Sequence, residues 1–150
     1  MSVQVTYSID KEAEDFWIND GGKVRIENNG KVLFESEIEL RHFWIVYIEM
    51  IENFTKKEKK TLGQYFHIDF CLEKAKKDDE IIFSIKCDDK HFQLNPVQLN
   101  KKDFLEKSLD AAISVYKELA EMTPKEQDIY GFNDSVKHIT ELKKQISHGK

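Results

Sequence analysis

The residues best suited to chemistry are His67, Asp69 and Cys71, which alternate along a predicted strand over residues 65–72. Side chains two positions apart on a strand share one face, so these three would project together from the sheet. A group of cysteine, histidine and aspartate is typical of nucleophilic catalysis. However, such neighbours lie roughly 7 Å apart along the strand, which is too far for a direct hydrogen bond between nucleophile and base. We therefore favour the solvent-facing side of a sheet, and keep a partner-contacting surface and catalysis as alternatives.

No second arrangement of residues in the sequence points to an active site. The five histidines lack zinc-binding spacing, and neither a phosphate-binding glycine loop nor a serine nucleophile motif is present. The acidic pairs Asp78–Asp79 and Asp88–Asp89 fall in predicted turns, where aspartate hydrogen-bonds to the local backbone. Cys71 and Cys87 are expected to be reduced packing residues. The sequence thus predicts no catalytic residue, no metal and no cofactor, and an enzyme is the weaker class of function.

Length and composition predict a single domain over residues 1–150, with an uneven distribution of charge. The formal net charge of −5 argues against general binding to nucleic acid or to an anionic membrane. Residues 1–54 contain eleven acidic and five basic residues, so the acidic excess lies in the first third of the chain. This excess can serve solubility alone, or it can form an acidic face that attracts a basic partner.

The N-terminal residues lack the basic and apolar regions of a signal peptide, and no apolar stretch is long enough to span a membrane. Lysine outnumbers arginine 21 to 2, a preference typical of AT-rich bacterial genomes. We therefore expect a bacterial protein that is located in the cytoplasm.

The segment over residues 23–36 predicts a β-hairpin. The apolar residues of its two arms are Val24, Ile26, Val32 and Phe34. A two-residue turn at Asn29–Gly30 would place the two apolar sets on opposite faces, whereas a three-residue loop over 28–30 pairs residue 26 with 32 and 24 with 34. The longer loop also places opposite charges across from one another. We therefore predict the three-residue loop.

Three amphipathic helices are predicted from apolar spacing and capping residues. Ser36 and Glu39 have the spacing of a capping box, which predicts a helix over residues 37–54 with a wide aromatic stripe. Asn100 is the expected N-cap of a second helix that ends near residue 122. A narrower stripe over residues 134–147 predicts a loosely docked C-terminal helix.

Alternating apolar residues predict the strands. They cover residues 3–9, 16–18, the two hairpin arms, 65–72, 81–87 and 91–94. The last three form a meander that ends at Asn95–Pro96. We therefore predict an α+β fold with a mostly antiparallel sheet of five to six strands. Helices over about 37–54 and 100–122 pack on one face of that sheet, and the C-terminal helix completes the domain.

The block WINDGGKVRIENNGKVLFESEIELRHFWIVYIEMIENF, over residues 17–54, resembles small bacterial immunity proteins of polymorphic-toxin and contact-dependent growth inhibition systems. In those proteins a glycine-turned hairpin leads into an aromatic-rich helix, followed by a short meander and a C-terminal helix. The similarity covers about residues 16–122. It implies a protein that binds a toxin domain and blocks it without catalysis. These proteins share no catalytic motif, so the resemblance assigns no residue a role.

The distribution of charge is compatible with the role that the resemblance implies. A nuclease toxin presents a basic groove to phosphates, and an acidic partner can occupy that groove. We therefore expect a non-catalytic immunity protein that covers the active site of a cognate toxin domain, most simply a basic nuclease, with no nucleic acid or membrane partner. The predicted partner-binding residues are Asp15, Asp20, Glu35, Glu37, Asp69, Asp88 and Asp89. A self-associating or general interaction module, including a homodimer, is the first alternative, and a small-molecule binder or enzyme is the second.

Overall fold

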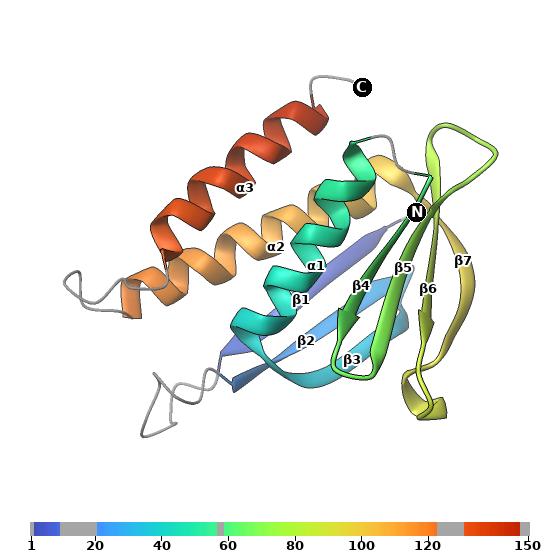
Figure 1. Ribbon diagram of the computed structural model, residues 1–150, viewed down its shortest axis with the longest axis horizontal. Helices are drawn as coiled ribbons and strands as arrows, with labels where there is room; N and C mark the ends of the chain where they lie inside the picture. The colour runs from blue at the N-terminus through green and yellow to red at the C-terminus, as the bar shows by residue number, and fades with distance from the viewer. Residues whose placement is uncertain (1, 10–20, 57–58, 123–130, 148–150) are drawn as a thin grey trace.

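A computed structural model of the chain describes residues 2–9, 21–56, 59–122 and 131–147. In this part of the chain, seven strands form two antiparallel sheets and three α-helices pack on them (Figure 1). The elements in chain order are β1 (Val3–Ile9), β2 (Gly21–Asn28), β3 (Lys31–Glu39), α1 (Leu40–Thr55), β4 (Lys60–Tyr65), β5 (Ile68–Lys74), β6 (Glu80–Lys86), the short 3-10 helix η1 (Lys90–Phe92), β7 (Leu94–Asn100), α2 (Lys101–Met122) and α3 (Phe132–Ser147). The predicted α+β class is confirmed, but the single sheet of five to six strands is wrong. The predicted strand over 16–18 lies outside the described residues.

The first sheet has the strand order β1–β2–β3, and its hairpin turns more tightly than predicted. Asn28 pairs with Lys31, so the connection is the two-residue turn Asn29–Gly30. Both turn residues have left-handed backbones, with φ of 53° and 84°. That geometry is the type I′ turn for which Asn-Gly is the preferred sequence. The predicted three-residue loop is therefore wrong.

A β-bulge explains how Phe34 still lies opposite Ile26 although the turn is shorter than predicted, whereas Val32 is left exposed. The register between β2 and β3 shifts between Ile26 and Glu27: Glu27 pairs with Val32 and Ile26 pairs with Phe34, so that Leu33 is the extra residue. Leu33 and Phe34 are consequently both buried although they are adjacent in the strand. An extra residue in one strand reverses the alternation of its side chains, which is the correction that a two-residue turn needs here.

Helix α1 begins later than predicted because β3 continues through residues 36–39. The hydroxyl of Ser36 donates to the backbone oxygen of Glu37 at 2.9 Å, and Glu39 stands at the N-cap without a side-chain cap. The predicted capping box is therefore wrong. The predicted apolar stripe is confirmed. Its buried residues are Leu40, Phe43, Trp44, Tyr47, Ile48, Met50, Ile51 and Phe54.

The second sheet is the meander β4–β5–β6–β7. The predicted strand over 65–72 is wrong, because the turn at Phe66–His67 divides it and Tyr65 pairs with Ile68 across the turn. Helix α1 lies close over β4 because residue 63 is glycine. A Cβ atom on Gly63 would stand only 3.3 Å from the backbone oxygen of Val46. The strand predicted over 81–87 is confirmed as β6.

The chain after β6 also differs from the prediction. Residues 90–92 form η1, and the last strand begins at Leu94 and continues through Asn95–Pro96. The predicted strand over 91–94 is therefore wrong. The second predicted helix is confirmed as α2, and the backbone N–H of Asp103 donates to the Asn100 side chain at 2.8 Å.

The two sheets share one hydrophobic core. The ring of Phe34 in β3 meets Phe70 in β5 edge-on, with centroids 5.0 Å apart, and Phe43 of α1 packs on both rings. Helices α1 and α2 are joined by a hydrogen bond of 2.9 Å between the buried hydroxyls of Tyr47 and Ser108. Helix α3 packs on α2 (Figure 1) and buries Phe132, Ile139 and Leu142.

Candidate functional site

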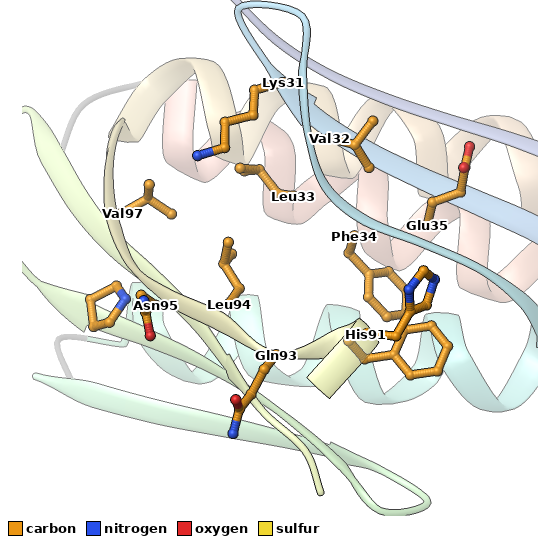
Figure 2. Close-up of a pocket in the computed structure, with 12 residues that line it drawn as sticks. Lys31, Val32, Leu33, Phe34, Glu35, His91, Gln93, Leu94, Asn95 and Val97 are labelled. Carbon is orange, nitrogen blue, oxygen red and sulfur yellow. The ribbon is translucent and has the colours of Figure 1, made fainter. Parts of the chain in front are cut away.

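An open groove lies where the two sheets meet without pairing (Figure 2). One wall is formed by residues 31–35 of β3, and the other by residues 91–97 of η1 and β7. We call this cavity, of about 620 Å³, the β3–β7 groove. Its size lies within the range of ordinary ligand and peptide sites. The groove is bounded by two edge strands, since each of them pairs with a neighbour on one side only.

Local irregularities keep the two edges apart. In β7, Asn95 and Pro96 together oppose the single residue Ser84, so this strand carries a β-bulge. Proline has no backbone N–H to donate, and a bulge bends the strand away from a flat edge. On the other wall, the bulge at Leu33 interrupts β3. These devices leave a gap that side chains line, in place of a continuous sheet.

The middle of the groove is apolar. Figure 2 shows Leu33 and Leu94 pointing into the groove from opposite walls, and Val97 beside them. Phe34 closes one end, where its ring centroid lies 5.8 Å from that of Phe92. Val32 is one of the exposed large hydrophobic residues of the described chain. An occupant of the groove would therefore bury apolar surface against both sheets.

The ends of the groove are polar. The Arg25 guanidinium holds the Glu35 carboxylate on one wall at 3.4 Å. Near this end, the backbone N–H of His91 donates to the Asp89 side chain at 2.9 Å. Lys31 lies at the opposite end and reaches across the groove (Figure 2). No carboxylate among the described residues forms an ion pair with the Lys31 amino group. The groove thus offers a cation at one end and an acceptor at the other.

The predicted partner-binding residues do not all meet at this site. Glu35 lines the groove. Glu37 is exposed, and the strand register places it opposite Lys23 on β2. Asp69 lies opposite Lys86 on β6. Each of these acids is therefore accompanied by a base, which weakens the negative field that we predicted for them.

Of the four remaining predicted acids, two lie just before η1, which forms part of the second wall, and two lie outside the described residues. Asp88 and Asp89 are exposed and immediately precede η1. Asp89 already caps that short helix. Asp15 and Asp20 lie outside the described residues. The sequence analysis did not identify Val32, Leu94 and Val97 as residues of the site. The pair Asn95–Pro96 was the available signal, because proline within a strand is typical of an edge strand as well as of a strand end.

The row of His67, Asp69 and Cys71 on one strand is not formed. His67 is the second residue of the β4–β5 turn, whereas Asp69 and Cys71 belong to β5. Cys71 is buried and pairs across the sheet with Leu62. The arrangement that suggested a nucleophile and its base is therefore broken by the turn.

Two tyrosines have clearly raised pKa values, and both join neighbouring elements. Complete burial raises the pKa of Tyr47, and the hydrogen bond from Ser108 opposes this only in part. Burial also raises the pKa of Tyr7, whose hydroxyl lies 2.7 Å from that of Ser114 in a second groove of about 640 Å³ between β1 and α2. Each phenol is paired with a serine hydroxyl, which makes it a structural contact.

Among the described residues, no group of three or more histidine, cysteine and acidic side chains is placed to hold a metal ion. No helix in that part of the chain is long and apolar enough to cross a membrane. The chain matches no protein-family model, and no curated protein or solved structure is significantly similar to it. The β3–β7 groove and the resemblance of residues 17–54 to immunity proteins are therefore the two observations that bear on its function.

Proposed function

We propose that this chain is a non-catalytic immunity protein that binds a cognate toxin domain through the β3–β7 groove and neutralises it. The observation that carries the proposal is the groove, which is open, apolar along its middle and charged at its ends. Protein interfaces have this arrangement, with an apolar centre that anchors side chains and a polar rim that orients them. The resemblance of residues 17–54 to immunity proteins supports a toxin as the partner.

The charges at the groove suggest what the toxin contributes. Asp88 and Asp89, which are exposed just before the second wall, favour a basic side chain at that end, whereas Glu35 on the first wall is already paired with Arg25. Lys31 at the opposite end favours a carboxylate. We therefore expect an extended loop of a basic toxin domain, with one apolar side chain between Leu33 and Leu94. A nuclease fits this description because its active site must attract phosphates.

Site-specific photo-crosslinking tests the proposal. A photoreactive amino acid at position 97, on the groove wall, should capture the toxin domain from the native bacterium, and mass spectrometry identifies it. The purified chain should then inhibit that toxin at a one-to-one ratio and protect cells that express it. If the captured protein remains fully active when the chain is bound, the proposal is wrong.

A matched pair of variants locates the binding surface. Val32→Lys places a charge in the apolar middle of the groove, and we expect it to weaken toxin binding at least about tenfold. Thr6→Lys adds the same side chain to an exposed position of β1 and serves as the control. Equal affinity of the two variants would exclude the groove as the contact, even if the toxin itself is confirmed.

A further inference from the structure

A second groove lies between β1 and α2, at the edge of the first sheet that is opposite the β3–β7 groove (Figure 1). We propose that it binds the C-terminal segment of another protein, which adds to the edge of β1 as an antiparallel strand. The segment has a basic side chain two residues before its last residue, and its free carboxylate lies at Lys107. This β1–α2 groove has a volume of about 640 Å³ and is lined by residues 5–9 of β1 and by one face of α2.

The backbone of β1 is oriented so that a strand can be added at this edge. The backbone oxygen of Ser2 accepts a hydrogen bond of 2.8 Å from the turn that follows β2, so Ser2 faces β2. Val3 faces the other way, because its backbone N–H donates to Asp103 of α2 at 2.7 Å. Since these directions alternate along an antiparallel strand, the backbone groups of Val5 and Tyr7 also point away from β2. Within the described chain β1 pairs with β2 alone, so these groups have no strand partner.

Strand β1 also has the fewest features that prevent strand addition. It contains no charged residue and no proline, and it pairs with β2 without a register shift. By contrast, β3 and β7 each carry a bulge, and β4 contains Lys60. A regular and uncharged edge is where an extended segment adds most readily, and the hydrogen bonds between the two backbones supply affinity.

The groove is closed at the start of β1, which favours a chain end as the occupant. The Val3 N–H is already bound to Asp103, and the Val3 oxygen lies 3.5 Å from the Lys107 amino group. An added strand therefore finds no free backbone group beyond Val5 in this direction. A segment whose last residue lies opposite Val5 ends at this point, and its carboxylate accepts a hydrogen bond from the Val5 N–H. Such a segment runs antiparallel to β1.

The Lys107 amino group is available to that carboxylate. The Lys107 side chain is 45% exposed, and its distances to the Asp103 carboxylate and the Val3 oxygen are long, at 3.7 and 3.5 Å. An ammonium group has three donors, so Lys107 can bind a further acceptor. Capture of a C-terminal carboxylate is a recurring mode of peptide recognition.

Glu118 determines the side chain that fits the middle of the segment. The Tyr7 hydroxyl lies 2.7 Å from that of Ser114, which places the Tyr7 side chain against α2. Burial is the main cause that raises the pKa of Tyr7, and the charge of the nearby Glu118 carboxylate adds to it. Residues opposite one another on paired strands project from the same face, so the segment residue opposite Tyr7 projects toward Glu118. A carboxylate at this place favours lysine or arginine.

The last residue of the segment meets an apolar part of the groove. It lies opposite Val5, which is partly buried against the hydrophobic core. On α2 the lining residue between Lys107 and Ser114 on this face is Ala111, whose short side chain leaves room for an aliphatic group. We therefore expect a segment that ends in the order basic residue, any residue, aliphatic residue.

Fluorescence anisotropy with a synthetic peptide tests this proposal. The probe is the labelled pentapeptide Gly-Thr-Arg-Thr-Val with a free carboxylate, and it should bind saturably below about 1 mM. Amidation of its terminus, or glutamate in place of its arginine, should raise the dissociation constant at least about tenfold. Absence of saturable binding up to that concentration overturns the proposal, as does equal affinity for the amidated peptide.

Variants of the chain assign the contacts. Val5→Pro removes the outward N–H without a loss of pairing to β2, and it should weaken binding at least about tenfold. Glu118→Lys should reverse the preference, so that the peptide with glutamate binds more tightly than the peptide with arginine. If this variant still prefers arginine, the proposed position of the segment is wrong. Val32→Lys lies at the β3–β7 groove and should leave peptide binding unchanged, so this test is independent of the proposed toxin contact.

Hydrogen exchange in the unmodified chain keeps the test independent of any folding defect in the variants. The peptide should slow exchange of the Val5 and Tyr7 amides, because both become bound to the added strand. Exchange at Val97, on the wall of the other groove, should not change. Unaltered exchange at Val5 and Tyr7 with the peptide at saturation would contradict strand addition to β1.

Discussion

The hydrogen bond between Tyr47 and Ser108 gives a quantitative test of how α1 and α2 are held together. The two hydroxyl oxygens lie 2.9 Å apart, and neither side chain is accessible to solvent. Ser108→Ala removes the partner and leaves the Tyr47 hydroxyl buried without a hydrogen bond. A buried unsatisfied polar group costs about 1–3 kcal/mol, so we expect this variant to lose stability in that range.

The reverse substitution should cost less. In Tyr47→Phe the remaining hydroxyl belongs to Ser108, which lies inside a helix and can donate to the backbone oxygen four residues earlier. We therefore expect a loss of about 0.5–1.5 kcal/mol. The double variant Tyr47→Phe/Ser108→Ala removes both polar groups, and it should be more stable than the sum of the single losses predicts, by about 1 kcal/mol.

Urea unfolding of the four proteins measures this cycle, and a loss of 1 kcal/mol corresponds to a decrease in Tm of roughly 2–4 °C for a domain of this size. Circular dichroism of each variant is the control that its fold is unchanged. Equal losses for the two single variants, or a double variant equal to their sum, would refute the reasoning that an orphaned phenol in this core is the larger defect.

Three other predictions concern the helices and the core. Since burial raises the Tyr47 pKa, the neutral phenol is favoured in the folded state. The free energy of unfolding should therefore keep its full value below about pH 10 and decrease as the pH rises further. Urea unfolding across this pH range should show a smaller decrease for Tyr47→Phe. Asn100→Ala removes the cap of α2 and should cost about 1 kcal/mol in the same assay, whereas Asn100→Ser should retain most of the stability. Phe132→Ala should cost about 3–5 kcal/mol and expose α3 to limited proteolysis, because this ring is buried against Tyr116.

The helices could be predicted where the residues that determine them lie close together in the sequence. The apolar stripe of α1 and the Asn100 cap of α2 depend on residues within one or two turns, and both are confirmed. The start of α1 was not predictable from Ser36 and Glu39. Those residues have the spacing of a capping box, but their backbone pairs with β2, so the ladder of the sheet overrides the local preference.

In the hairpin, the apolar pattern of the two arms led to the rejection of the turn that Asn-Gly favours, although that turn is the one formed. Asn29–Gly30 is the preferred two-residue turn, yet the apolar pattern of the two arms contradicts it unless one residue is added elsewhere. The structure adds that residue as the bulge at Leu33. A bulge has no firm sequence signature, so the pattern alone favoured the longer loop.

The groove was not predictable because it depends on which strands fail to pair. Alternation identifies strands, but it does not say where one sheet ends and the next begins. Here the division follows from Asn95–Pro96 in β7 and from the bulge in β3, which face each other although more than sixty positions separate them in sequence. Edges that carry a proline, a bulge or charges resist strand addition and leave side chains to bind a partner.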